Sequence, residues 1–123
     1  MTTIHQQSGS IFDHLRVLEF EEGERRHEFI QTNIFCDYPC SIAIFTAEIK
    51  PGKWAWGYNV FTKDCKNMCQ TPSLEYGHCR SERDAKLYVL GFLLANGSIF
   101  TKDACEAIGN AIRDLQQLNL FEL

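Results

Sequence analysis

The segment that most constrains the fold is residues 41–62, SIAIFTAEIKPGKWAWGYNVFT. Pro51-Gly52 is a turn-forming pair between two runs rich in β-branched and aromatic residues, which predicts a β-hairpin. If Lys50 faces Lys53, side-chain alternation places an apolar row from each strand on one face. The cross-strand pairs in this register are Ile49 with Trp54, Ala47 with Trp56, Phe45 with Tyr58, and Ala43 with Val60. A slip by one residue would turn the aromatic row to water, so the pattern predicts this register and a buried Trp56.

Length and composition favour one folded domain. The chain has 123 residues, 45% of them hydrophobic, and a net charge of −4, which argues against a broad phosphate-binding surface. We expect residues 1–10 to be a flexible N-terminal arm and residues 11–123 to be a single domain. There is no apolar run of membrane-spanning length, and the N-terminus lacks the regions of a signal peptide. These features predict a cytoplasmic protein with no membrane association and with its six cysteines as thiols.

Two helices are expected after the hairpin. Ser81-Glu82-Arg83-Asp84 is a variant capping box, which predicts a helix over residues 81–96 that ends at Asn96-Gly97. A stripe of apolar residues predicts a second helix over residues 101–119. The expected fold is α+β: an antiparallel sheet of three to four strands, with the central hairpin at 41–62, whose aromatic face packs on both helices. Residues 11–20 fit either a helix or a strand, and residues 63–80 form the least regular part of the chain.

Four cysteines lie as two pairs beside the two ends of the hairpin. The CxxxC pairs are Cys36 with Cys40 and Cys65 with Cys69. Closure of the hairpin would bring the pairs together, and four thiolates are a common ligand set for structural Zn²⁺. These four cysteines are therefore a candidate zinc site, with His78 or Cys79 as a substitute ligand. The alternative interpretation is that no cofactor binds and the cysteines act as small, partly buried hydrophobic residues.

Several basic residues gather near the hairpin turn, the cysteine loop and the start of the first helix. They are Lys50, Lys53, Lys63, Lys66, Arg80 and Arg83. Such a group could contact phosphates of a nucleic acid or an acidic partner. The alternative interpretation is a set of scattered, solvated cations.

The first helix has more apolar surface than one sheet and one neighbouring helix can cover. Its apolar residues are Leu87, Tyr88, Val89, Leu90, Phe92, Leu93 and Leu94. The excess predicts either a symmetric homodimer or a cover supplied by residues 11–20.

Two stretches carry a resemblance to known proteins. Residues 52–60, GKWAWGYNV, and residues 80–94, RSERDAKLYVLGFLL, resemble a pattern of small accessory proteins of phages, plasmids and conjugative elements. That pattern has an aromatic strand, a polar loop and a Ser-led helix. The strand-then-helix order is also similar to a double-stranded RNA-binding domain, although that family has a lysine-rich helix start. The resemblance implies a mobile-element or phage context and identifies no site residue.

Motifs of catalysis are missing from the sequence. There is no phosphate loop, GxGxxG, HExxH or GxSxG. We therefore expect a non-enzymatic interaction protein that binds a protein partner or nucleic-acid machinery. One alternative is a nucleic-acid-binding module that uses the basic loop and the helix start. Another is a thiol-based redox protein or cysteine enzyme, in which Cys79 would be the nucleophile and His27 its base.

Overall fold

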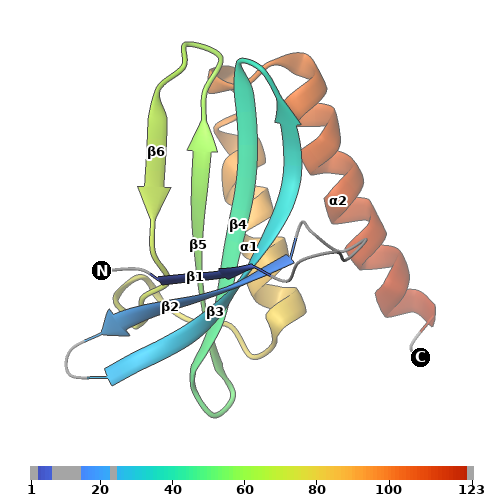
Figure 1. The fold of residues 1–123 in the computed structure, drawn as a ribbon. Coiled ribbons are helices and arrows are strands. Elements are labelled where there is room, and N and C mark those ends of the chain that lie inside the picture. The colour runs from blue at the N-terminus through green and yellow to red at the C-terminus, as the bar shows by residue number, and fades with distance from the viewer. Residues whose placement is uncertain (1–2, 7–14, 23–24, 122–123) are drawn as a thin grey trace.

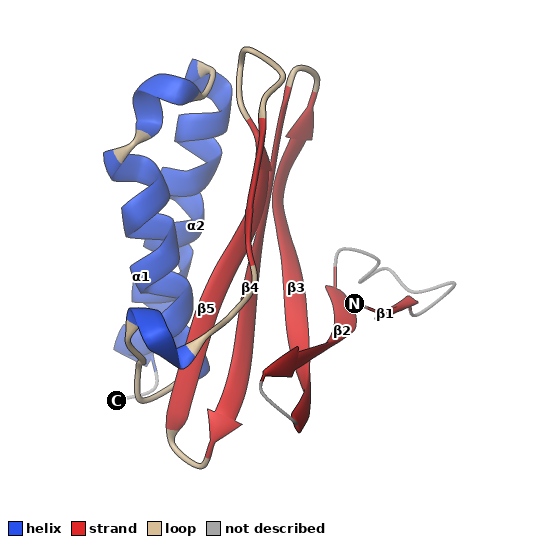
Figure 2. Ribbon diagram, turned by 90° about the vertical axis from the view of Figure 1, so that its left-hand side faces the viewer, coloured by secondary structure: helices blue, strands red, loops and turns tan. Residues whose placement is uncertain are grey.

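A computed structural model describes residues 3–6, 15–22 and 25–121. The described residues form an antiparallel sheet whose strands follow the order of the chain, with two helices on one face (Figures 1 and 2). The strands are β1 (Thr3–Gln6), β2 (Leu15–Glu22), β3 (Arg25–Asp37), β4 (Cys40–Lys50), β5 (Lys53–Phe61) and β6 (Asn67–Gln70). The helices are α1 (Glu82–Ala95) and α2 (Lys102–Phe121), and the 3₁₀ turns are η1 (Leu74–Tyr76) and η2 (Gly97–Ile99). The predicted α+β fold is confirmed, with β1 and β6 as additional edge strands in a sheet of six.

The sheet has two faces and two ends. The helix face carries α1 and α2, and the open face is the opposite one (Figure 2). The hairpin end is the turn at Pro51-Gly52, and the cysteine end is the opposite end, where residues 38–39 and 62–66 turn.

The N-terminal part of the chain belongs to the sheet. Residues 15–20, which fit either a helix or a strand, lie in β2, and β2 pairs with β3 from Leu15↔Thr32 to Glu22↔Arg25. Four residues of the predicted arm form β1. The other residues of that arm and residues 11–14 lie outside the described part of the chain.

The central hairpin forms as predicted, but the register predicted for it is wrong over most of its length. Lys50 faces Lys53, and a β-bulge between Glu48 and Lys50 then shifts the pairing by one residue. Trp56 therefore faces Thr46 instead of Ala47. The shift is tolerated because β4 is apolar on both sides, so either row of its side chains can be buried.

Each face of the hairpin has its own apolar cluster. On the helix face, Trp56, Tyr58 and Val60 of β5 lie with Ile42 and Ile44 of β4 against both helices. On the open face, the cluster consists of Phe29, Phe45, Ala47, Ile49 and Ala55, with Leu74 packed against it. The prediction that the aromatic row of β5 packs on the helices is confirmed, and Trp56 is only 7% exposed.

Two segments cover the open face near the hairpin end. The first part of β3 extends beyond its pairing with β4, and the ring of Phe29 meets Phe45 edge-on at 4.9 Å between centroids. The chain after β6 then crosses the open face over Gly57, and Leu74 reaches the apolar cluster. Towards the cysteine end, the open face has no such cover from the described residues.

Both helices begin where the sequence predicts. The Ser81 hydroxyl accepts a hydrogen bond from the Asp84 N–H at 3.1 Å, and Thr101 accepts one from the Ala104 N–H at 3.3 Å. Helix α1 ends at Asn96, whose N–H donates to carbonyls of the last turn. Residues 63–80, predicted to be irregular, contain β6 and η1, because a turn at residues 62–66 brings Met68 opposite Val60.

Candidate functional site

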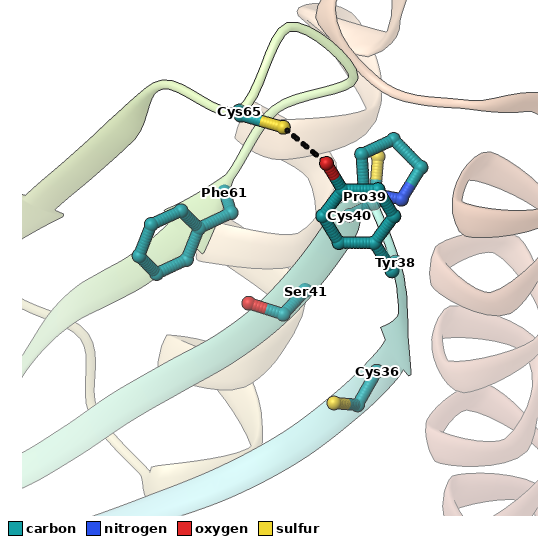
Figure 3. Close-up of a pocket in the computed structure, with 7 residues that line it drawn as sticks. All are labelled: Cys36, Tyr38, Pro39, Cys40, Ser41, Phe61 and Cys65. Carbon is teal, nitrogen blue, oxygen red and sulfur yellow. Dashed lines mark hydrogen bonds between the residues drawn. The ribbon is translucent and has the colours of Figure 1, made fainter.

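A cavity of about 360 Å³ opens at the cysteine end of the sheet. It is lined by Cys36, Tyr38, Pro39, Cys40, Ser41, Phe61 and Cys65. Figure 3 shows the rings of Tyr38 and Phe61 on either side of the Ser41 side chain. These rings are 87% and 42% exposed, which is unusual for aromatic side chains in a small domain. The volume lies in the range of about 300–1,000 Å³ that is typical of ligand sites.

The turn that carries Tyr38 touches the turn that follows Phe61. The Cys65 thiol donates a hydrogen bond to the Tyr38 hydroxyl at 3.5 Å, and both residues line the cavity (Figure 3). Cys65 adopts a backbone φ of +62°, which is uncommon for a residue with a side chain. Hydrogen bonding between the neutral phenol and the Cys65 sulfur, followed by the charge of the Cys65 thiolate, raises the pKa of Tyr38 above the usual 10.0. The phenol therefore stays neutral at physiological pH.

A second cavity of about 210 Å³ adjoins the first on the open face. The two cavities share Cys36 and Ser41, and the lining of the second includes the amide side chains of Gln31, Asn33 and Asn59. Gln31 donates a hydrogen bond to Asn33 at 2.9 Å, and Asn67 donates one to Asn59 at 2.8 Å. Each amide of this cavity thus makes a hydrogen bond with a neighbouring amide.

The candidate zinc ligands are dispersed. Cys36 lies at the exposed end of β3, whereas Cys40 is buried and its sulfur accepts a hydrogen bond from the Thr101 N–H at 3.4 Å. Cys65 is engaged with Tyr38, and Cys69 lies on β6 opposite Asn59. Among the described residues, no three His, Cys, Asp or Glu side chains are close enough to hold a metal ion. The structure therefore does not gather the four cysteines, or the substitutes His78 and Cys79, into a metal site.

The predicted basic surface separates into two groups. Lys50 and Lys53 lie at the hairpin end, and Arg80 and Arg83 are brought near them by the pairing of Trp54 with Cys79. Lys63 and Lys66 lie at the cysteine end. The nine residues of β5 separate the groups by about 25 Å at the usual rise per residue. One continuous basic surface is therefore not formed.

Thiol chemistry receives no support from Cys69 or Cys79. Burial raises the pKa of Cys69, and burial together with the charge of Asp84 raises the pKa of Cys79. Both changes favour the protonated thiol, whereas a cysteine nucleophile needs the thiolate. The side chain of His27, the base proposed for Cys79, is outside the described part of the structure.

A second exposed apolar area lies on the helix side. Tyr88 is 54% exposed and its ring packs on Trp56 at 4.9 Å between centroids. Phe92 packs on Trp56 and Tyr58 at 6.2 and 5.8 Å. Met68 of β6 extends this area, because it faces Val60 on the same side of the sheet. We call Tyr88, Phe92 and Met68 the helix-side aromatic surface.

Three residues of the larger cavity, Cys36, Cys40 and Cys65, were expected from the sequence only as zinc ligands. Tyr38, Phe61 and Asn59 were not among the expected site residues. The signal for Phe61 and Asn59 was the alternation of β5, which places both on the face opposite Trp56. The position of Tyr38 beside Phe61 depends on the contact between two turns, and no feature of the local sequence indicates it.

Within the described residues, no helix has the length and apolar character needed to cross a membrane. Comparison of the chain with protein-family models, curated proteins and solved structures finds no match.

Proposed function

We propose that this protein is a non-enzymatic interaction module, and that its helix-side aromatic surface binds a second copy of the chain. The observation that carries the proposal is the exposure of large apolar side chains on a helix whose opposite face is already packed. Val89, Leu90 and Leu93 of α1 are buried, as expected for a helix on a sheet. Tyr88 and Phe92 remain at least 40% exposed, together with Met68 and Leu94. Exposed apolar areas of this kind mark interaction sites on soluble domains.

The charge distribution favours a second copy as the partner. Residues 67–73 and 87–101 contain no formally charged residue, whereas the whole chain carries a charge of −4. A neutral apolar area offers an acidic or basic partner no charge to recognise. A symmetric dimer buries the area against itself and keeps the like charges of the two chains away from the contact.

The competing cover from residues 11–20 receives no support. Residues 15–20 lie in β2, which Figure 2 shows beyond the open face, on the side away from the helices. The rest of that segment, residues 11–14, is outside the described part of the chain.

Light scattering coupled to gel filtration tests the proposal. We expect a mass of twice the 14.2 kDa chain at high micromolar concentration. Tyr88→Arg should return the mass to that of one chain, because it buries a charge in the contact. Tyr38→Arg is the matched control, since it makes the same change at an exposed tyrosine of the cysteine end. A wild-type mass of one chain at every concentration, or an equal effect of both substitutions, would overturn the proposal.

We also propose that the protein is cytoplasmic. All six cysteines are free thiols, and Cys36, Cys65 and Cys69 are exposed. A reducing compartment keeps exposed thiols in this state, whereas an oxidising compartment would pair them.

A further inference from the structure

We propose that the two adjoining cavities at the cysteine end bind unpaired nucleotides of a single-stranded nucleic acid. The site lies on the open face of the sheet and does not depend on the helix-side aromatic surface. It adds a ligand class to the proposed interaction module.

The lining of the cavities defines the chemistry of the ligand. No charged residue lines either cavity. The larger one is bounded by two aromatic rings, and its polar groups are hydroxyls and thiols. A group that fits this lining is neutral, flat, apolar on its faces and polar at its edges. A nucleobase has these properties, and aromatic side chains on a sheet are a common platform for stacked bases.

The smaller cavity supplies groups that can recognise base edges. Asn59 accepts a hydrogen bond from Asn67 through its carbonyl oxygen, which leaves its NH₂ group with no partner among the described residues. Gln31 donates to Asn33, and its own carbonyl oxygen is likewise left without a described partner. The adjoining cavities therefore offer a donor and an acceptor beside the stacking platform.

The charged residues at the rim explain how the backbone would be held. Lys63 and Lys66 flank Cys65 in the β5–β6 turn and are exposed. Asp37 and Asp64 are also exposed at this end, so the rim has no excess of positive charge. Two lysine–phosphate contacts to a single strand predict a plot of log affinity against log salt with a slope of about −1.4. Such a shallow slope means that stacking, and not charge, supplies most of the binding free energy.

Fluorescence anisotropy with labelled oligonucleotides of mixed sequence tests the site. Single-stranded DNA and RNA should both bind. The ratio of the two affinities shows which of the two nucleic acids the site prefers. The matching duplex should bind at least about tenfold more weakly, because its bases are already stacked on each other. Phe61→Ala and Tyr38→Ala should each weaken single-strand binding by about fivefold to a hundredfold. Phe61→Trp should retain binding, because it keeps an aromatic face.

Matched lysine variants separate the site from general charge effects. Lys63→Ala should make the salt slope shallower by about 0.7. Lys50→Ala removes the same charge at the hairpin end and should leave both affinity and slope unchanged. Thermal melting of every variant shows whether the fold is retained, as expected for these exposed side chains.

Three outcomes would overturn the inference. They are equal binding of duplex and single strand, Phe61→Ala with wild-type affinity, and a Tyr- or Trp-rich peptide that binds the cavities while no oligonucleotide does. Tyr88→Arg distinguishes this inference from self-association: it should abolish the dimer and leave Phe61-dependent binding in place.

Discussion

Replacement of Gly57 by alanine tests how the chain is wrapped around the central hairpin. Gly57 lies on β5, and its open-face side is crossed by the segment that follows β6. A methyl group at this position would overlap the Gln70 carbonyl oxygen and lie 3.0 Å from the Pro72 nitrogen. Both obstacles are backbone atoms, so rotation of a side chain cannot relieve the overlap.

The crossing segment has little freedom to move away. Gln70 pairs with Tyr58 in the sheet, Pro72 is fully buried, and Leu74 packs on the apolar cluster of the open face. Displacement of the segment would therefore weaken a strand pairing and expose an apolar side chain. Insertion of a methyl group into a packed site usually costs about 1–3 kcal/mol, and we expect Gly57→Ala to lie at the upper end, about 3 kcal/mol.

Urea unfolding followed by tryptophan fluorescence measures this cost. The midpoint should fall with little change in slope, and the melting temperature should fall by roughly 10 °C for a domain of this size. Gly109→Ala is the matched control, because Gly109 lies in α2 with nothing within 4 Å of an added methyl group. Alanine there should raise the free energy of unfolding by up to about 1 kcal/mol through helix propensity. A Gly57→Ala variant within about 0.5 kcal/mol of wild type would refute the close approach of residues 70–72 to β5.

Further predictions concern the core, the first helix, pH and metal. Trp56→Ala should lower the free energy of unfolding by about 3–5 kcal/mol, because the side chain is 7% exposed beneath α1; unchanged melting would exclude Trp56 from the core. Ser81→Ala should cost about 1 kcal/mol in urea unfolding, since it removes the acceptor of the Asp84 N–H, whereas Ser81→Asn should restore most of the loss. The pKa of Cys79 is raised above its ordinary 9.0, so the unfolded chain loses this proton first and stability should fall as pH rises above that value. A Cys79→Ala variant should show a shallower decline in pH-dependent melting, and identical profiles would contradict the burial of this thiol. Because no three ligand-type side chains converge among the described residues, EDTA should leave the melting temperature unchanged; a fall together with stoichiometric bound zinc would restore the four-cysteine site.

Some of this fold could be predicted from short stretches of sequence. Ser81 and Asn96 mark the ends of α1 through hydrogen bonds made within a few residues, so the helix was found almost to its boundaries. The alternation of β5 likewise identified its buried aromatic row. In β4 the same reasoning failed, because Ile42 and Ile44 face the helices while Phe45 and Ala47 face the open-face cluster.

Tertiary structure decided the register and the candidate site. A bulge beside Lys50 sets which row of β4 faces the helices, and no residue there signals it. Lys63 and Arg80 are seventeen positions apart in sequence, yet the length of β5 places them at opposite ends of the sheet. Tyr38 and Phe61 meet at one cavity only because the antiparallel pairing of β4 and β5 brings their ends together. The sequence by itself determined the elements whose hydrogen bonds are local. Contacts between distant segments depend on the register of whole strands, and only the folded sheet defines that register.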